Sequence, residues 1–530
     1  MTRILSYGNN VPKVETDILT HGGKMRLTVV LVLVFSFIPL LVTPVLPLTD
    51  FYAHVARYYV LANLADSPTL QESYETAWQL LPNLGLDVLG VFLMKALPPL
   101  LAGKLIAGLI IAAPMAGVLY LAHVLHGRVS ILHVLLAGLV AYNHILIWGF
   151  SNFLLGLGVL LGATGYWIAA RDRPSRQLAV TVCLGLILFF IHGLAFALWG
   201  LLLGAVELSL ARQAGQTSLS ELARRAGRLL LVAVAPVILF LQTKTVGGGA
   251  ATAFTNFVTH AEQGTLATRL GTEVSLRAEG ILRVVESTSR TADYGLGALV
   301  WATLAIGLLA GIWQIDKRMR LAIALCIVLV VITPPNLFGV GHLSERIPLL
   351  LLTLLAASLS LNPQALKKHQ HTALVVLAAL LLVRNLILSV SWYQDGLVYS
   401  SYLDAMRQHD TRNLGAGVYL EGTEDPGAVA PSCMPLPFLM TFNGTAVPTF
   451  ANPTQQPLRI IGNLRDVQAT IRQINSQTGQ TVSFALSVLA TAKTDTVVVC
   501  STASFAAEIE GYEIISATAP WTLYQRAAAQ

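Results

Sequence analysis

Long apolar segments dominate the first three quarters of the chain and limit the folds that it can adopt. From residue 27 to about residue 391 the sequence returns repeatedly to apolar runs of about 20 residues, the length that a helix needs to span the hydrocarbon core of a bilayer. Hydrophobic residues make up 55% of the 530 and charged residues only 12%. We therefore expect a polytopic α-helical membrane protein and not a string of soluble domains.

About eleven of these runs are predicted to cross the membrane as helices. The predicted spans are 27–46, 100–124, 129–147, 151–169, 178–191, 193–210, 229–241, 296–315, 321–335, 347–361 and 372–391. Residues 178–210 are assigned as two spans on either side of His192, because a single span there would turn two later basic clusters outward.

Lysine and arginine are concentrated in alternate loops, and this asymmetry predicts the orientation. The basic loops contain Arg128; Arg171, Arg173 and Arg176; Arg212, Arg224, Arg225 and Arg228; Lys317, Arg318 and Arg320; and Lys367 and Lys368. Because such residues accumulate on the cytoplasmic side, residues 1–26 are expected to form a cytoplasmic tail. An odd number of spans then places residues 394–530 outside. The net charge of +6 is explained by these loops and requires no nucleic-acid partner.

The segment 47–61, PLTDFYAHVARYYVL, follows the first span and is too polar to extend it. On a helix Asp50, His54 and Arg57 lie along one face, at the boundary between membrane and water. A carboxylate there can act as a base or bind a metal, an imidazole can orient it, and a guanidinium can hold a phosphate. The plain structural alternative is an interfacial helix that is capped by Thr49 or Asp50, with Arg57 reaching lipid headgroups.

Two long loops are expected on the outer face, at 47–99 and 242–295. In the first, Asp87 begins a second amphipathic stretch at 84–97, so two interfacial helices are predicted to cover a cavity. The second loop opens with glycines at 247–249 and continues into a predicted helix over 262–286, whose charges fit a solvated face or, alternatively, a lid. The aromatic turn at 142–153 is interpreted as an aromatic belt with polar caps.

A short glycine-rich outer loop, PPNLFGVGHLSERIP, brings together His342, Glu345 and Arg346. An arginine at the edge of a helical bundle either extends to lipid headgroups or binds an anionic ligand inside. Because the three ionisable side chains occur together, we favour ligand binding.

Proline and glycine become frequent after about residue 394, where a small α/β-type domain is predicted. A helix is expected over 463–476, and strands are expected at 496–500, 513–516 and 522–525. Cys433 and Cys500 lie in this region, where an extracytoplasmic location would allow them to form a disulfide. The four cysteines show no zinc-type spacing.

With these residues described, a resemblance can be stated. The layout of residues 27–393 resembles the GT-C superfamily of membrane glycosyltransferases, which have many spans and an acidic residue just after the first one. The segments DFYAHVARYYVL, PNLGLD, YNHILIWGFSNFLLGLG and WTLYQR resemble a group of bacterial membrane proteins. Many GT-C enzymes carry paired acids in the first outer loop, whereas Phe51 follows Asp50 here and Asp87 is the remaining candidate for a second acid.

The resemblance implies a function in the bacterial inner membrane. Such enzymes move a hexosyl or pentosyl group from a polyprenyl-phosphate-linked donor, taken from the bilayer, to a glycan, lipid or protein acceptor on the outer face. In that case Asp50 is the candidate base and His54 its orienting neighbour. Arg57, Asp87, His342, Glu345 and Arg346 are then candidates for substrate binding. The cofactor is left open, with a divalent metal as one candidate.

Two other classes of protein stay open from the sequence. A secondary transporter would carry ionisable residues in the middle of its spans and repeated halves, yet the spans contain few charges, Arg384 being the clearest, and no internal repeat is recognisable. A non-catalytic assembly protein or receptor would use the C-terminal domain for binding.

Overall fold

The structure is a computed structural model, and its described residues cover most of the chain. They are 18–243, 266–336, 340–365, 367–409, 413–419, 433–475, 482–500, 511–518 and 520–527. Most of the predicted cytoplasmic tail, residues 1–17, and the glycines at 247–249 lie outside the described residues.

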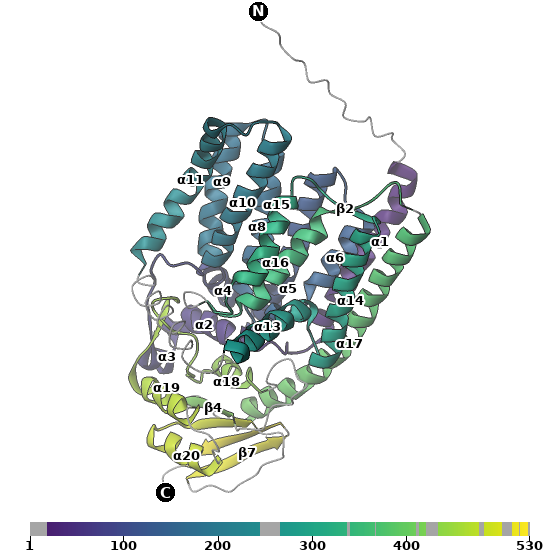
Figure 1. Cartoon of the computed structure of the whole chain (residues 1–530). Coiled ribbons are helices and arrows are strands. Elements are labelled where there is room, and N and C mark those ends of the chain that lie inside the picture. The colour runs from purple at the N-terminus through teal and green to yellow at the C-terminus, as the bar shows by residue number, and fades with distance from the viewer. Residues whose placement is uncertain are drawn as a thin grey trace, which may run out of the picture.

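A bundle of helices forms the greater part of the molecule (Figure 1). Each predicted span overlaps one helix of the bundle: α1 (Ile18–Val42), α5 (Pro99–His126), α6 (Ile131–Ala141), α8 (Ser151–Ala169), α9 (Pro174–Ile191), α10 (Gly193–Gln213), α11 (Leu219–Gln242), α14 (Arg290–Leu309), α15 (Arg320–Ile332), α16 (Leu343–Ser358) and α17 (Lys367–Gln408). In the described part of the chain, seven helices are long and apolar enough to cross a bilayer: α5, α8, α9, α10, α11, α14 and most of α17. The predicted polytopic helical architecture is confirmed, and the number of crossings stays a prediction.

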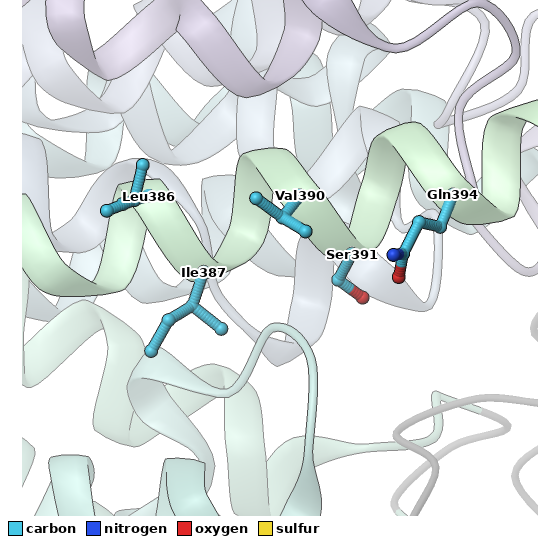
Figure 2. A pocket seen from close by; sticks show the side chains of 5 residues that line it. All are labelled: Leu386, Ile387, Val390, Ser391 and Gln394. Carbon is cyan, nitrogen blue, oxygen red and sulfur yellow. The ribbon is translucent and has the colours of Figure 1, made fainter.

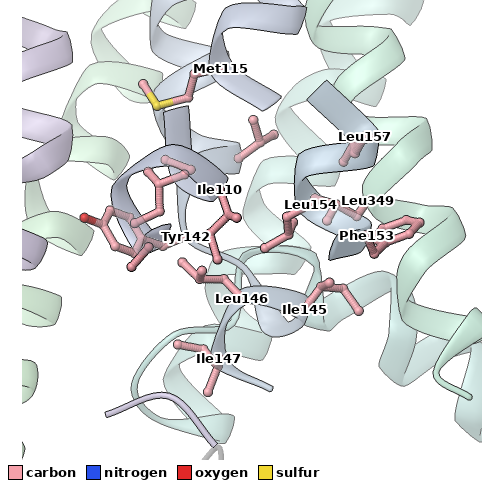
Figure 3. Close-up of a cluster of buried hydrophobic side chains, with 14 of the residues drawn as sticks. Ile110, Met115, Tyr142, Ile145, Leu146, Ile147, Phe153, Leu154, Leu157 and Leu349 are labelled. Atoms are coloured by element: carbon pink, nitrogen blue, oxygen red, sulfur yellow. The ribbon is translucent and has the colours of Figure 1, made fainter. Parts of the chain in front are cut away.

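The centre of the bundle is closely packed around α5 and α8. A Cβ atom added at Gly158 of α8 would lie 2.3 Å from the carbonyl carbon of Ala113 in α5, so the absence of a side chain is what allows this approach. Figure 3 shows the apolar side chains beside this contact, among them Ile110, Phe153 and Leu157. This rigid packing supports the loops at one end of the bundle.

The first outer loop folds into short elements that lie against the end of the bundle. They are α2 (Phe51–Asn63), the 3-10 turn η1 (Leu64–Asp66), α3 (Pro68–Ser73), β1 (Tyr74–Thr76) and α4 (Gly85–Ala96). The two predicted amphipathic helices correspond to α2 and α4. They pack on each other where Gly90 faces Tyr58, because a Cβ at Gly90 would meet the tyrosine ring at 2.4 Å.

Four further connections between bundle helices contain short elements. They contain α7 (His144–Ile147); α13 (Leu266–Leu282) with the 3-10 turn η3 (Arg283–Val285); and the strands β2 (Trp313–Ile315) and β3 (Leu359–Leu361), which pair antiparallel. α13 and η3 correspond to the helix that was predicted over 262–286. Not all of its charged residues lie on a solvated face, as the sequence suggested, because Glu286, just after η3, is completely buried.

The C-terminal region is a small α/β unit, as predicted. α17 runs to Gln408, well beyond residue 394, and the sheet has the order β4-β6-β8-β7, with β4 and β6 parallel and the other pairs antiparallel. The strands are β4 (Gly415–Tyr419), β6 (Thr496–Cys500), β7 (Tyr512–Thr518) and β8 (Trp521–Arg526); the helical elements are α18 (Leu436–Leu439), η4 (Met440–Asn443), α19 (Gly462–Asn475) and α20 (Val482–Thr491). The Cys433 and Cys500 thiols are both buried and free, so their oxidation to a disulfide stays a prediction.

The C-terminal unit is joined to the first outer loop by a shared strand pair and a shared core. β5 (Leu458–Ile460) pairs antiparallel with β1, so that Tyr74 lies opposite Ile460. Val60 and Leu70 of the outer loop belong to the same buried cluster as the inner face of the sheet. The first outer loop is therefore enclosed between the bundle and the C-terminal unit.

Candidate functional site

A cavity of about 1180 Å³ lies where the first outer loop, the bundle and the C-terminal unit meet. One wall is apolar and comes from the ends of α9, α10 and α11. The other walls are polar and come from α2, the start of α8 and α16, a C-terminal loop at 449–456, and α19. The ionisable residues that line the cavity are Asp50, His54, Arg57, His192, Arg346 and Arg472.

Asp50 lies at the start of α2 and faces the cavity. It occupies the N-cap position, yet its side chain makes no capping hydrogen bond. Among the described residues no group hydrogen-bonds or pairs with its carboxylate. Burial raises its pKa to about 6, against a smaller opposing effect of His342. A carboxylate with a pKa near neutrality and no protein partner is suited to accept a proton from a bound hydroxyl.

The backbone around Asp50 is held by the segment that follows α7. The amides of Thr49 and Asp50 donate to the carbonyls of Ile147 and Trp148, at 2.9 and 3.2 Å. Gly149 follows with a φ of +81°, and a Cβ there would lie 2.3 Å from the Phe51 nitrogen, so only glycine fits. The aromatic turn at 142–153, which the sequence suggested to be a membrane-interface belt, thus contacts and positions the candidate base.

Arg57 and Asp87 form a buried ion pair beneath the cavity. Arg57 Nε lies 2.6 Å from Asp87 Oδ1 and Nη2 lies 3.3 Å from Oδ2, and each side chain is 1% exposed. The same Nη2 lies 3.0 Å from Nδ1 of His54. Burial and the neighbouring Arg57 charge hold the pKa of His54 well below its usual value, so His54 is a neutral acceptor.

This pairing changes the roles that were expected for His54, Asp87 and Arg57. His54 contacts Arg57, and the described contacts include no hydrogen bond from its ring to the Asp50 carboxylate that it was expected to orient. Asp87 does not line the cavity, and it neutralises Arg57 from behind. Because its charge is already matched, Arg57 is a weaker candidate for holding a phosphate than its sequence position indicates.

Arg346, in the first turn of α16, is a buried cation that lines the cavity without a carboxylate partner. Its guanidinium stacks over the rings of Phe150 and Phe153, at 4.3 and 5.2 Å from their centroids. Its Nη1 lies 3.4 Å from His192 Nε2, and Nε has no hydrogen-bond partner within the described part of the chain. No described carboxylate oxygen lies within 4.0 Å of it. A buried arginine in this state is prepared to receive an anion.

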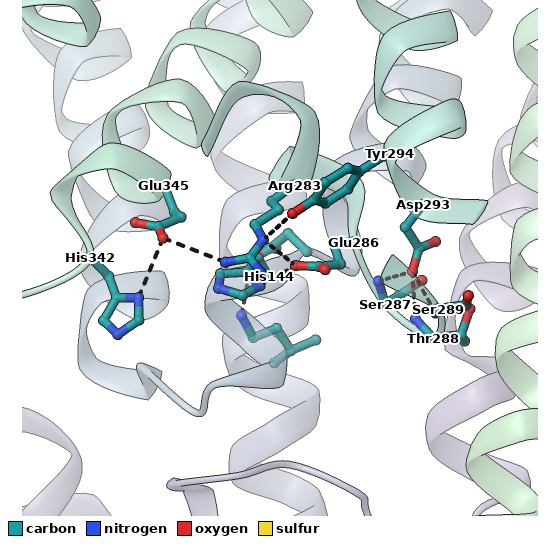
Figure 4. Close-up of polar contacts among 12 residues, drawn as sticks. His144, Arg283, Glu286, Ser287, Thr288, Ser289, Asp293, Tyr294, His342 and Glu345 are labelled. Atoms are coloured by element: carbon teal, nitrogen blue, oxygen red, sulfur yellow. Dashed lines mark hydrogen bonds and ion pairs between the residues drawn. The ribbon is translucent and has the colours of Figure 1, made fainter. Parts of the chain in front are cut away.

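His342 and Glu345 lie behind the cavity wall, and neither is among the residues that line it. They belong to a polar network with Arg283, Glu286 and His144 that Figure 4 displays. His342 Nδ1 is 3.6 Å from Glu345 Oε1, and Arg283 Nη1 is 3.9 Å from the same oxygen. The structure therefore separates these two from Arg346, with which the sequence had grouped them.

Several lining residues carried no signal in the sequence. Asn83 and Asn152 line the cavity, and Asn152 donates to the Asn83 carbonyl and accepts from the Leu86 amide. His192 caps α10 by accepting a hydrogen bond from the Ala195 amide, and its other nitrogen faces Arg346. In the sequence, an isolated asparagine or histidine in an apolar context resembles an ordinary helix cap. The unusual feature of Asn83 is its positive φ, which is visible only in the fold.

A second, smaller pocket of about 390 Å³ lies against α17 (Figure 2). Its lining residues are Leu386, Ile387, Val390, Ser391 and Gln394. They come from a single helix and include no ionisable group, so this pocket offers no comparable chemistry.

Comparisons with known proteins give distant structural matches. No protein-family model and no curated protein sequence matches the chain. ArnT from Cupriavidus metallidurans bound to undecaprenyl phosphate matches with 13% identity and a TM-score of 0.47, over 96% of this chain and 98% of that one. The arabinofuranosyltransferase AftD from Mycobacteria matches with 15% identity and a TM-score of 0.38, over 96% of this chain and 42% of that one. At TM-scores below 0.5 neither a common fold nor an activity is inferred from these matches.

Proposed function

We propose that this chain is a membrane glycosyltransferase of the GT-C type. It transfers a sugar from a polyprenyl-phosphate-linked donor to an acceptor on the extracytoplasmic face. The observation that carries the proposal is the pair formed by Asp50 and Arg346. Within the described part of the chain neither side chain has a partner of opposite charge, and both line one cavity that also has an apolar wall. Such a donor needs all three features.

The apolar wall supplies the place for the polyprenyl chain. Phe189, Phe196 and Phe240 come from the ends of three successive helices and line the cavity. The outer surface of α11 is strongly apolar and exposed, for example at Leu230, Val234 and Leu241. A lipid tail lying in the bilayer can therefore follow α11 into the cavity without leaving an apolar environment.

The polar walls then fit the reacting groups. With the donor phosphate at Arg346, the oxygen of an acceptor hydroxyl attacks the anomeric carbon and loses its proton to Asp50. The bond from the anomeric carbon to the phosphate oxygen breaks, and its electron pair stays on the phosphate, whose growing charge the guanidinium stabilises. The amides of Asn452, Gln455 and Gln456 line the side toward the C-terminal unit, where a hydroxyl-rich acceptor would enter.

A transport function receives less support from the same contacts. Arg384 is the clearest charge within a span, and it donates to the carbonyls of Leu139 and Tyr142, at 2.6 Å for Leu139. These bonds stabilise the approach of α17 to α6. Arg384 is thus a structural residue, whereas Arg346 faces the cavity.

Binding of undecaprenyl phosphate to purified protein in lipid nanodiscs tests the proposal without knowledge of the sugar. Arg346→Ala is expected to weaken binding by about tenfold or more, because the phosphate loses a charge-assisted contact. Arg407→Ala is the matched control, since Arg407 is exposed on α17 and pairs with Asp404. Equal affinity of wild type and Arg346→Ala would contradict the assignment of the donor site.

A further inference from the structure

His144, His342 and Glu345 converge behind the cavity, although they come from two distant parts of the chain. Each offers one ligand atom, and these atoms all lie within 4.8 Å of one another. Ligands of a tetrahedral zinc ion lie about 3.4 Å apart. His342 Nδ1 and Glu345 Oε1 are already 3.6 Å apart, so closing the three atoms around an ion needs side-chain movements of about 1 Å.

His144 and Glu345 are each oriented by a further polar group, as metal ligands usually are. The Nδ1 atom of His144 contacts the buried Glu286 carboxylate, and its Nε2 atom is buried without a hydrogen-bond partner among the described residues. Ser344 Oγ donates to Oε2 of Glu345 at 2.7 Å, which leaves Oε1 directed toward His342. An imidazole nitrogen and a carboxylate oxygen that lie close together are typical zinc ligands.

The backbone conformation and the charges of the cluster also favour a bound cation. His342 adopts a φ of +57°, in the left-handed region that is costly for residues other than glycine. Among the described residues, Arg283 is the one arginine or lysine within ion-pair distance of Glu286 and Glu345, at 3.3 and 3.9 Å. A bound cation would add positive charge beside these two carboxylates in a largely buried environment.

We propose that His144, His342 and Glu345 bind a divalent cation of the zinc class. Two imidazoles and one carboxylate suit a borderline metal such as Zn²⁺ better than Mg²⁺ or Ca²⁺, which prefer oxygen ligands throughout. The site is separate from Asp50, the candidate base.

The cation has a positioning role in this account. His144 begins α7, whose following residues hold the backbone of Asp50, while Glu345 immediately precedes Arg346. An ion between them fixes the candidate base relative to the candidate phosphate-binding arginine. This role goes with the proposed function, but metal binding itself does not depend on it.

Metal content is the test, because it is read without any sugar-transfer assay. Protein purified in detergent, incubated with Zn²⁺ and freed of loose metal on a desalting column is expected to retain about one zinc ion per chain. X-ray absorption at the zinc edge should show two imidazole ligands. A zinc-free wild-type protein, or a spectrum without imidazole scattering, would overturn the proposal even if every variant failed to fold.

Variants then assign the ligands. Glu345→Gln and His342→Asn are expected to lower zinc affinity by more than about tenfold, and Glu286→Gln by about tenfold through loss of the group that orients His144. Glu279→Gln makes the same charge change one helical turn before Arg283, outside the cluster, and should leave zinc binding unchanged. Wild-type zinc affinity in Glu345→Gln and His342→Asn would contradict the assignment.

Discussion

Asp50 owes its chemical character to what surrounds its carboxylate. An aspartate at a helix start normally accepts hydrogen bonds from the first amides of the helix, which lowers its pKa. Here the carboxylate makes no capping bond, and burial raises its pKa to about 6. It is therefore both ionised at neutral pH and basic enough to take a proton.

This pKa predicts how activity depends on pH. A general base works only when it is deprotonated, so the rate of sugar transfer should be constant at neutral pH and fall by about tenfold per unit as the pH drops below about 6. The measurement is kcat/KM for transfer between about pH 5 and pH 8. A flat profile across that range would exclude a base with this pKa.

At individual positions, the sequence predicted which residues line the cavity better than it predicted which residues they contact. Asp50, His54, Arg57 and Arg346 were singled out from their types and places after apolar runs, and all four line the cavity. The partner of Arg57 could not be deduced, because Asp87 is 30 residues away and only the packing of α2 on α4 brings them together. The ring contact between Arg346 and Phe150 likewise depends on tertiary structure.

Among the structural elements, α2 and α4 form a clamp whose strength depends on one buried ion pair. Asp87→Asn leaves the Arg57 charge without a counter-ion in a site that is 1% exposed. Its free energy of unfolding should therefore fall by about 3 to 5 kcal/mol. Denaturant unfolding in detergent micelles measures this loss.

The matched control is the exposed pair between Glu75 and Arg459, which joins the same loop to the C-terminal unit. Its side chains are 44% and 51% exposed, so Glu75→Gln should lower the free energy of unfolding by less than about 1 kcal/mol. Similar losses for the two variants would show that the Arg57–Asp87 pair is no more important than a surface contact.

Helices and strands followed from local pattern more completely than their connections did. Apolar length predicted each helix of the bundle, and the three predicted C-terminal strands correspond to β6, β7 and β8. The pairing of β1 with β5 was not foreseen, because β1 is three residues long and its partner lies almost 400 residues away. A strand as short as β1 is stabilised mainly by pairing with its partner strand, and a single sequence does not reveal that partner.

The two ends of the bundle differ in charge and in the features that they carry. The connections between α8 and α9 and between α10 and α11 are rich in arginine, and Arg171 and Arg225 both pair there with Glu207. Residues from the other ends of the same helices line the cavity. In Figure 1 these ends face the C-terminal unit. We infer that the basic end is cytoplasmic and that the cavity and residues 394–530 are extracytoplasmic.

Reporter fusions test this orientation. A fusion after residue 220, at the basic end of the bundle, should report the cytoplasm, and a fusion after residue 420 should report the outside. Reporters that place both positions on the same side of the membrane would overturn the predicted orientation and span number together.

The release of polyprenyl phosphate from polyprenyl-phosphate-linked sugars tests the central claim most directly. Purified protein in lipid is supplied with a panel of hexosyl and pentosyl donors together with extracted envelope acceptors, and wild type is compared with Asp50→Asn. The amide keeps the shape of the side chain but cannot accept a proton, so we predict release from at least one donor by wild type and a loss of about 100-fold or more in the variant. Asp66→Asn, an exposed change in the same loop, should retain full activity. Transfer by Asp50→Asn at the wild-type rate would contradict the account.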